Sequence, residues 1–256
     1  MKENIRSTLS KELLTQPFAS DKDESATMAK GQQIAYEYAR IENSIAVLSD
    51  LKSDKSYIYN GGVAEKLGLS EKKCIKKLDS IWEEEIFKRI HPDDLIEKHL
   101  LELRFFHLLK NIPINERIDY HIVSRLRMAD DSGEYIQIQH RMFYVGSCPL
   151  GNLWLALCLY NFSYNVAALD VFNGIIINSA TGRIIKSDDE KCRNILSSRE
   201  KEILQLIEKG KASIEIADIL SISKNTVSRH RQNILEKLRV KNSIEACRIA
   251  KIMNMI

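Results

Sequence analysis

The chain has 256 residues, of which 44% are hydrophobic and 29% charged, a composition typical of a globular protein large enough for two domains. No apolar run approaches the roughly 20 residues that span a bilayer, and the N-terminus lacks the hydrophobic stretch of a secretory signal, so we expect a cytoplasmic protein without a membrane partner. The five cysteines are odd in number and never occur as Cys-x-x-Cys, which favours free thiols over a disulfide framework or a zinc site.

Charge is distributed unevenly along the chain. The net charge is +3, but from Leu196 onward 12 lysines and arginines stand against 7 acidic residues, whereas residues 1–195 hold 26 against 28. Between Ser221 and Lys241 the only acidic residue is Glu236. Positive charge gathered at one end of a chain indicates contact with a polyanion.

The first predicted element is an N-terminal helical segment over residues 1–52. Its apolar side chains repeat with steps of 4, 3, 4 and 3, which is the spacing of a heptad stripe. The stripe consists of Ile34, Tyr38, Ile41, Ile45 and Leu48. Two heptads leave two alternatives open: the stripe pairs with its twin in a dimer, or it lies across the domain that follows.

Residues 53–185 are predicted to mix strands and helices. A strand around Ile58 ends at Gly61-Gly62 and precedes a lysine-rich stretch that we expect to be helical. A long helix is predicted over 93–110, because Pro92 fits a first turn and the acidic pair after it complements the helix dipole. Further strands are predicted over 119–128, 134–145 and 153–162, and a last hairpin over 171–185.

This order of elements, together with Ile90-His91-Pro92-Asp93-Asp94, resembles a PAS domain. The resemblance implies a sensor or dimerisation module built on an antiparallel sheet with helices, with or without a small molecule between the two layers. No cofactor is indicated. The Asn-Cys-Arg pattern of a photochemical flavin domain is missing, and we expect His99 and His107 to be packing or solvent histidines rather than haem ligands. His91 is expected to be a helix-start residue.

A polar connector over 186–195 leads to a predicted domain over 196–256. Ser197 and Glu200 form a capping box that starts its first helix, and Gly210 stands where a left-handed cap ends it. The inward positions predicted for this helix are Ile203, Leu206 and Ile207.

Two more helices follow, separated by a short turn. The second runs from about Ser213 to Leu220, Ser221-Ile222 forms the turn, and Ser223 can cap the third. Small Ala217 allows the close crossing that a helix-turn-helix requires. Asn242-x-x-Glu245 then caps a fourth helix.

These helix starts, core positions and basic residues, from Leu196 to Ala246, resemble the LuxR-type (also called NarL/FixJ-type) helix-turn-helix of bacterial regulators. The resemblance implies an all-α four-helix DNA-binding domain whose fourth helix often forms a dimer contact, so that two copies read two half-sites. One departure is Ala212, where the family has a serine or threonine cap. Its loss costs about 1 kcal/mol unless Ser213 takes over.

The third helix carries the predicted contacts to DNA. Val227, Ile234 and Leu238 set its inward face, with His230 and Leu235 at the margins. We expect His230 to be a packed, hydrogen-bonded residue rather than a base contact. Ser228, Arg229 and Gln232 lie on the outer face, at the positions with which the family reads bases. An arginine can bond guanine O6 and N7, and a glutamine the edge of adenine. Predicted phosphate contacts are Lys211, Lys224, Asn225, Thr226, Arg231 and Lys237.

The sequence therefore predicts an α+β protein that acts as a sequence-specific transcriptional regulator, with a PAS-like domain governing the helix-turn-helix. The expected partners are double-stranded DNA, a second copy of the chain, RNA polymerase, and a small-molecule ligand in the PAS-like domain. One alternative, a sigma-factor-like polymerase subunit, requires an all-helical N-terminal domain. The other, an enzyme fused to a DNA-binding tail, is not favoured, because no Gly-rich phosphate loop, Gly-x-Ser-x-Gly or His-Glu-x-x-His occurs.

Overall fold

The computed structural model of the protein describes residues 5–19, 23–71, 74–163, 174–185, 196–238, 240, 242–252 and 256. The predicted connector over 186–195, which includes Cys192, lies outside them; the four described cysteines, Cys74, Cys148, Cys158 and Cys247, are free. The chain divides into two compact units, Leu9–Ile184 and Ile185–Ile256, the second of which also takes in Met1–Thr8. No helix within the described ranges is both long and apolar enough to cross a membrane.

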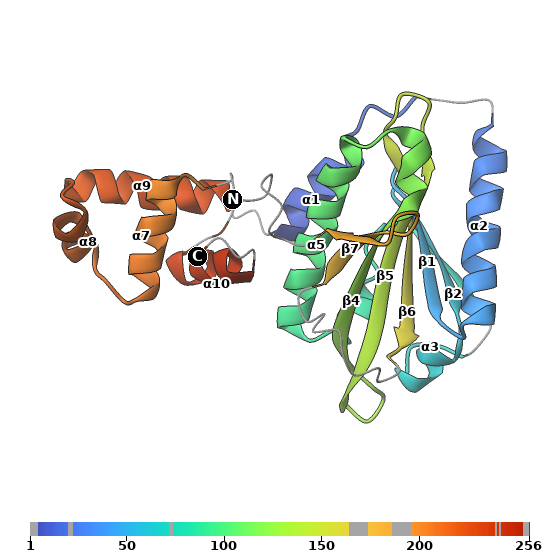
Figure 1. The fold of residues 1–256 in the computed structure, drawn as a ribbon. Helices are drawn as coiled ribbons and strands as arrows, with labels where there is room; N and C mark the ends of the chain where they lie inside the picture. Colours follow the sequence, from blue (N-terminus) through green and yellow to red (C-terminus); the bar gives the residue numbers. More distant parts are fainter. Residues whose placement is uncertain are drawn as a thin grey trace. The chain divides into compact units, whose positions relative to one another are not determined.

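The first unit is built on one eight-stranded sheet, ordered β3-β2-β1-β6-β5-β4-β7-β8 (Figure 1). Its strands are β1 (Ile45–Asp50), β2 (Lys55–Asn60), β3 (Ile75–Leu78), β4 (Tyr120–Ala129), β5 (Tyr135–Ser147), β6 (Leu153–Phe162), β7 (Ile175–Asn178) and β8 (Arg183–Ile185). The strands predicted around Ile58 and over 119–128, 134–145 and 153–162 are confirmed, as is the hairpin within 174–185. Such a sheet contradicts the all-helical domain that the sigma-factor alternative requires.

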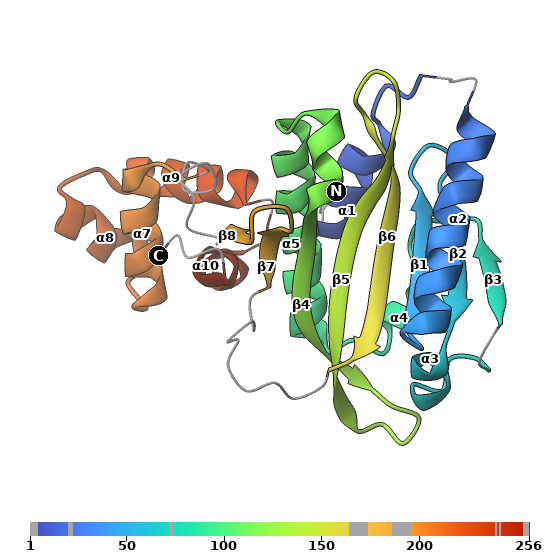
Figure 2. The same cartoon turned by 45° about the vertical axis from the view of Figure 1, so that its right-hand side comes forward.

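Helices cover both faces of this sheet (Figures 1 and 2). α2 (Glu24–Ile41) lies on one face, where it contacts β1, β2, β5 and β6. On the other face lie α5 (Pro92–Lys110) and residues 9–14 of α1 (Ile5–Leu14). Shorter helical elements are α3 (Gly62–Lys66), α4 (Glu84–Phe87) and the 3-10 helix η1 (Ile114–Asp119).

The heptad stripe predicted over 1–52 is not one helix. α2 ends at Ile41, whose side chain is exposed, and the last two members of the stripe, Ile45 and Leu48, lie in β1. The prediction of a helix is therefore wrong from Ile45 onward. Ile34 and Tyr38 pack against the sheet of their own chain, so the helical half of the stripe takes the second of the two alternatives.

The central strand β6 is buried on both faces, which explains why its sequence is apolar throughout. Leu155, Leu157 and Leu159 belong to the hydrophobic cluster beneath α2. Because side chains alternate along a strand, the residues between them point the other way, and Ala156 and Cys158 line a cavity together with residues of α5. The α5 side of the sheet thus receives both apolar and ionisable groups.

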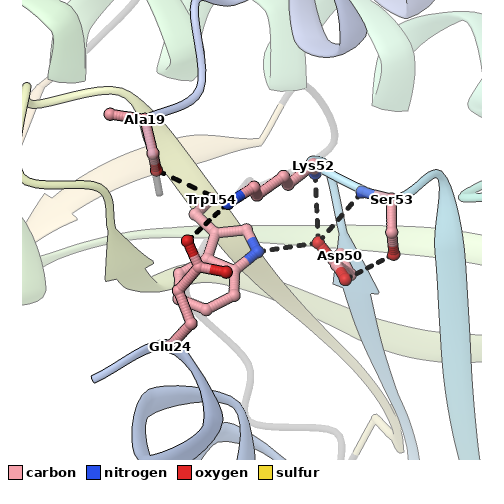
Figure 3. Close-up of polar contacts among 6 residues, drawn as sticks. All are labelled: Ala19, Glu24, Asp50, Lys52, Ser53 and Trp154. Atoms are coloured by element: carbon pink, nitrogen blue, oxygen red, sulfur yellow. Dashed lines mark hydrogen bonds and ion pairs between the residues drawn. The ribbon is translucent and has the colours of Figure 1, made fainter. Parts of the chain in front are cut away.

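Polar contacts join the end of β1 to β6 and to the start of α2 (Figure 3). The buried carboxylate of Asp50 accepts a hydrogen bond from Trp154 Nε1 at 2.7 Å and another from the Lys52 amide at 3.0 Å. The ammonium group of Lys52 pairs with Glu24 in the first turn of α2. These bonds fix where α2 begins over the sheet.

The start of α5 confirms the predicted role of His91. Its Nδ1 accepts a hydrogen bond from the Asp93 amide at 3.3 Å, and Pro92 occupies the first turn. Further along the helix, His99 is buried with its ring edge-on to Trp82 and Phe87, at 5.6 Å between ring centroids in each case. His99 is therefore a packing histidine, as predicted.

Candidate nucleic-acid interface

From Leu196 to Ile252, the described residues of the C-terminal unit form four helices around a small apolar core. They are α7 (Ser198–Glu208), α8 (Ser213–Leu220), α9 (Lys224–Lys237) and α10 (Ser243–Ile252). The predicted inward face of the third helix is confirmed, since Val227, Ile234 and Leu238 are all buried. In α7 the structure buries Ile203 and Leu204, whereas Leu206 and Ile207 are only half-buried. α7 thus turns Leu204, which was not predicted, towards the core.

The caps of α7 and α8 differ from each other in how complete they are. At α7 the capping box is complete: the Ser197 amide donates to Glu200 at 2.7 Å, and the Glu200 amide donates to Ser197 Oγ at 3.3 Å. At α8 only half of it exists, because the Ala212 amide donates to Glu215 at 2.7 Å but Ala212 has no side-chain acceptor. The Ser213 side chain does not supply the missing acceptor.

The turn between α8 and α9 contains a strained residue. Ser221 has φ 52° and ψ 45°, the left-handed conformation that normally favours glycine. Next to it, the Ile222 amide donates to Ala217 O at 3.0 Å. Ser223 then caps α9 by accepting from the Thr226 amide at 3.0 Å, as predicted.

The outer face of α9 exposes the three residues proposed to read bases. Ser228, Arg229 and Gln232 are exposed, on the opposite side of the helix from its buried residues. The Gln232 amide nitrogen donates a hydrogen bond to Glu236 Oε1 at 3.1 Å, one turn further along. The face therefore presents one guanidinium group and one amide held by an acidic neighbour.

The residues predicted to contact phosphate fall into two groups. Lys224, Asn225 and Thr226 are exposed in the first turn of α9, where free backbone amides also attract anions. Lys211, also exposed, pairs with Glu215 at 3.0 Å. The remaining two, Arg231 and Lys237, are engaged inside the unit.

Arg231 ties α9 to the first residues of two other helices. Its guanidinium group donates to Ser213 Oγ in α8 at 2.8 Å and to Ser243 Oγ in α10 at 2.9 Å. This use of Ser213 explains why that hydroxyl does not cap α8. The sequence showed a basic residue at a helix margin but did not predict that two serines distant in the chain would meet it.

Lys237 ties the other end of α9 to α7. Its Nζ donates to Glu200 Oε2 at 2.7 Å, and the Glu200 side chain is 3% exposed. Burial alone raises the pKa of Glu200, but the hydrogen bonds from Lys237 and Ser197 outweigh it, so the pKa lies below its usual value. The same carboxylate therefore caps α7 and anchors α9.

A third cationic side chain, that of Arg199, caps the C-terminal end of α8. Arg199 donates from its guanidinium group to Leu220 O at 2.6 Å and to Glu202 at 2.8 Å. His230 is half-buried, as expected of a packing position, but the expected hydrogen bond is missing at its buried Nδ1, which makes none within the part of the chain that the structure describes. The bonds of Arg231 and Lys237 thus attach α9 to the other three helices, while its outer face stays exposed.

Comparison with known families bears directly on this unit. The family described as "Bacterial regulatory proteins, luxR family" matches residues 194–250. Transcriptional regulatory protein DesR of Bacillus subtilis (strain 168) is 55% identical over 53 residues, which cover 21% of this chain and 27% of DesR. Uncharacterized response regulatory protein YgeK of Escherichia coli (strain K12) is 48% identical over 62 residues, covering 24% of this chain and 42% of YgeK.

Similarity over the whole chain is weaker. The phage VqmA-DPO complex covers 92% of this chain and of its own, with 15% identity and a TM-score of 0.31. The Vibrio cholerae VqmA dimer covers 88% of each chain, with 18% identity and a TM-score of 0.30. Similarity at this level does not identify the fold of the first unit. The chain spans less than half the length of the curated relatives named above. The family match and the four helices fall on the same part of the chain: the C-terminal unit contains a helix-turn-helix domain of the LuxR family of bacterial regulatory proteins.

Proposed function

We propose that the protein is a sequence-specific DNA-binding transcriptional regulator whose N-terminal unit governs the LuxR-family domain. The observation that carries the proposal is the contrast between the two faces of α9. Its inner face is fixed by Val227 and Ile234 and by the bonds of Arg231 and Lys237, whereas its outer face leaves Arg229 exposed. A rigid helix with open polar groups is what reading the major groove requires.

Within this proposal, Ser228, Arg229 and Gln232 contact base edges. Arg229 forms no ion pair with the residues that the structure describes. It is therefore the candidate for a bidentate bond to guanine. The side-chain nitrogen of Gln232 already donates to Glu236, which leaves its second N–H and its oxygen for a base. Arg229 is therefore proposed to contribute most of the discrimination between sequences.

Phosphate contacts are proposed for Lys211, Lys224, Asn225 and Thr226. The sequence also assigned this role to Arg231 and Lys237, and for these two we now propose that the internal bonds come first, because each is already held by partners on other helices. Their effect on DNA is then indirect, through the orientation of α9.

Three further parts of the proposal concern partners. A second copy of the chain is proposed to provide the second half-site reader, and RNA polymerase is proposed as the protein contacted at the promoter. For the N-terminal unit we propose a small-molecule ligand in an open pocket of about 270 Å³, lined by residues of β2, β3 and α4 such as Ile58, Leu78 and Ile86. These partners would make the unit a sensor as well as a scaffold.

The test is selection of DNA by the full-length protein from a pool of duplexes with a randomised centre, followed by fluorescence anisotropy on the selected site. We expect one enriched sequence, and for Arg229→Ala a loss of about 1 to 3 kcal/mol on that site, with preference relaxed at one position. Lys209→Ala, an exposed cation at the end of α7, is the matched control and should leave base preference unchanged. Absence of any enriched sequence would overturn the proposal.

A further inference from the structure

The α5 side of the N-terminal sheet holds a buried group of ionisable side chains, which we call the interior cluster: Glu83, Lys98, Glu102, His140 and Cys158. All five are buried. Lys98 and Glu102 lie one turn apart on α5, with 2.6 Å between Nζ and Oε1, while His140 and Cys158 project from β5 and β6. Buried ionisable groups cost free energy unless they are paired or bind a ligand, and the Lys98–Glu102 pair accounts for only two of them.

His140 has one ring nitrogen engaged and one available. Its Nδ1 lies 3.1 Å from Ser124 Oγ, on the neighbouring strand β4. Its Nε2 is buried, makes no hydrogen bond among the described residues, and lies 4.0 Å from Glu102 Oε1. Burial and the charge of Lys98 hold the pKa of His140 well below its usual value.

We infer that Glu102, His140 and Cys158 form a site for a divalent transition-metal cation of the Zn²⁺ class. One ligand atom from each residue, a carboxylate oxygen, an imidazole nitrogen and the Sγ, lies within 4.8 Å of the other two. A set of one oxygen, one nitrogen and one sulfur suits a borderline-soft cation rather than Mg²⁺ or Ca²⁺.

The geometry needs only a small adjustment. Bond lengths of about 2.0 to 2.3 Å in a tetrahedral site place ligand atoms roughly 3.3 to 3.8 Å apart, so the three side chains must close inward by about 1 Å at most. Ser124 already orients the imidazole through Nδ1, which is the supporting contact that metal-binding histidines characteristically make.

A small cavity borders the proposed site. It measures about 30 Å³ and is lined by Glu83, Lys98, Glu102 and Cys158, among others, which include two of the three proposed ligands but not His140. A cavity of this volume has room for about one water molecule, and an organic ligand of several rings does not fit there. Trp82 and Glu83 line both this cavity and the open pocket of about 270 Å³, so the two spaces are adjacent.

The charges of the interior cluster can balance a divalent ion. On binding, the Cys158 thiol loses its proton and becomes a thiolate ligand, so Glu102 and Cys158 together supply two negative charges. Lys98 opposes the ion, because its ammonium group already neutralises Glu102. The cation and the ammonium group of Lys98 therefore compete for one carboxylate.

The inference is tested with the full-length protein and metal alone, without DNA, so its outcome is independent of the proposed function. Titration with Co²⁺, a coloured substitute for Zn²⁺, should produce a thiolate-to-metal charge-transfer band that saturates at one equivalent and is bleached by Zn²⁺. Cys158→Ser should abolish the band, and Ser124→Ala should weaken binding about 10- to 100-fold. Cys74→Ser, which removes an exposed thiol outside the cluster, is the matched control and should change neither stoichiometry nor affinity.

Lys98→Met keeps the test decisive even where Cys158→Ser fails to fold, because it removes the competing charge and should tighten Co²⁺ binding. No charge-transfer band in the wild-type protein, or a band that depends on Cys74 and not on Cys158, would overturn the inference. Retention by the wild-type protein of an organic molecule but no metal in native mass spectrometry would also overturn it.

Discussion

Lys237, in the last turn of α9, donates a hydrogen bond to Glu200, in the first turn of α7, with 2.7 Å between Nζ and Oε2. The lysine is 43% exposed but the carboxylate only 3%. Removing the lysine thus leaves a buried negative charge without its cation, whereas removing an exposed lysine elsewhere does not.

Lys237→Ala is therefore expected to lower the free energy of local unfolding of α9 by about 1 to 2 kcal/mol, a value reduced by the partial exposure of the lysine. Amide hydrogen exchange of residues 224–237, followed by mass spectrometry, measures it. Lys224→Ala, exposed at the other end of the same helix, is the control and should stay within about 0.5 kcal/mol. If both variants lower the free energy of local unfolding by the same amount, Lys237 does not anchor α9.

The depressed pKa of Glu200 predicts how α7 responds to pH. A carboxylate whose pKa is lower in the folded state contributes stability that is fully present above the unfolded value of about 4.3 and is lost as the pH falls through the folded pKa. Protection of the α7 amides, corrected for intrinsic exchange, should thus decrease below about pH 4. Glu200→Gln should flatten this dependence, and an unchanged profile in that variant would contradict the assignment.

Variants of Arg231 and Lys224 distinguish two ways in which a cationic side chain can affect DNA binding: through contact with a phosphate, or through bonds that hold α9 in place. Lys224→Ala should reduce the slope of log affinity against log salt by about 1, because a phosphate contact is lost. Arg231→Ala should weaken binding through the loss of the bonds to Ser213 and Ser243 while leaving that slope unchanged. Anisotropy titrations at several salt concentrations measure both, and a reduced slope for Arg231→Ala would restore its role as a phosphate contact.

The left-handed Ser221 predicts a stabilising substitution. Ser221→Gly relieves a conformation that costs a non-glycine residue on the order of 1 kcal/mol. Because the greater entropy of glycine in the unfolded chain offsets part of this gain, the substitution should stabilise the helix-turn-helix by about 0.5 kcal/mol at most. Ser223→Ala, two residues on, should instead cost about 1 kcal/mol by removing the cap of α9. Hydrogen exchange of α8 and α9 distinguishes the two, and destabilisation by Ser221→Gly would show that the turn is not strained.

Elements governed by local chemistry were predictable from the sequence, and those governed by distant contacts were not. The start of α5 follows from Pro92 and the acids behind it, and the capping box at Ser197 follows from spacing alone. β3 was expected to be helical because of its lysines, but it is an edge strand paired with β2 that leaves Ile75 exposed, and only pairing decides that.

The contacts within the two units needed the tertiary structure for the same reason. Arg231 looks like a surface cation in the sequence, and its meeting with Ser213 and Ser243 depends on how three helices cross. His140 and Cys158 lie 18 residues apart in the chain, and only the pairing of β5 with β6 places both beside α5. The outer face of α9 required no such knowledge, because helical geometry and the buried residues determine it.

The bond between Gln232 and Glu236 affects how strongly Gln232 can discriminate between DNA sequences. On an unsuitable sequence the amide keeps its internal partner, and the exposed carboxylate repels the phosphate backbone to the same degree whatever the bases are. A suitable sequence competes with Glu236 for the amide, whose second N–H and oxygen are free. The repulsion is the same on both kinds of DNA, and where the bond to Glu236 is exchanged the correct site gains only the difference between the new bond and the old one. Gln232 then adds less to the ratio between the two affinities than an amide without an internal partner.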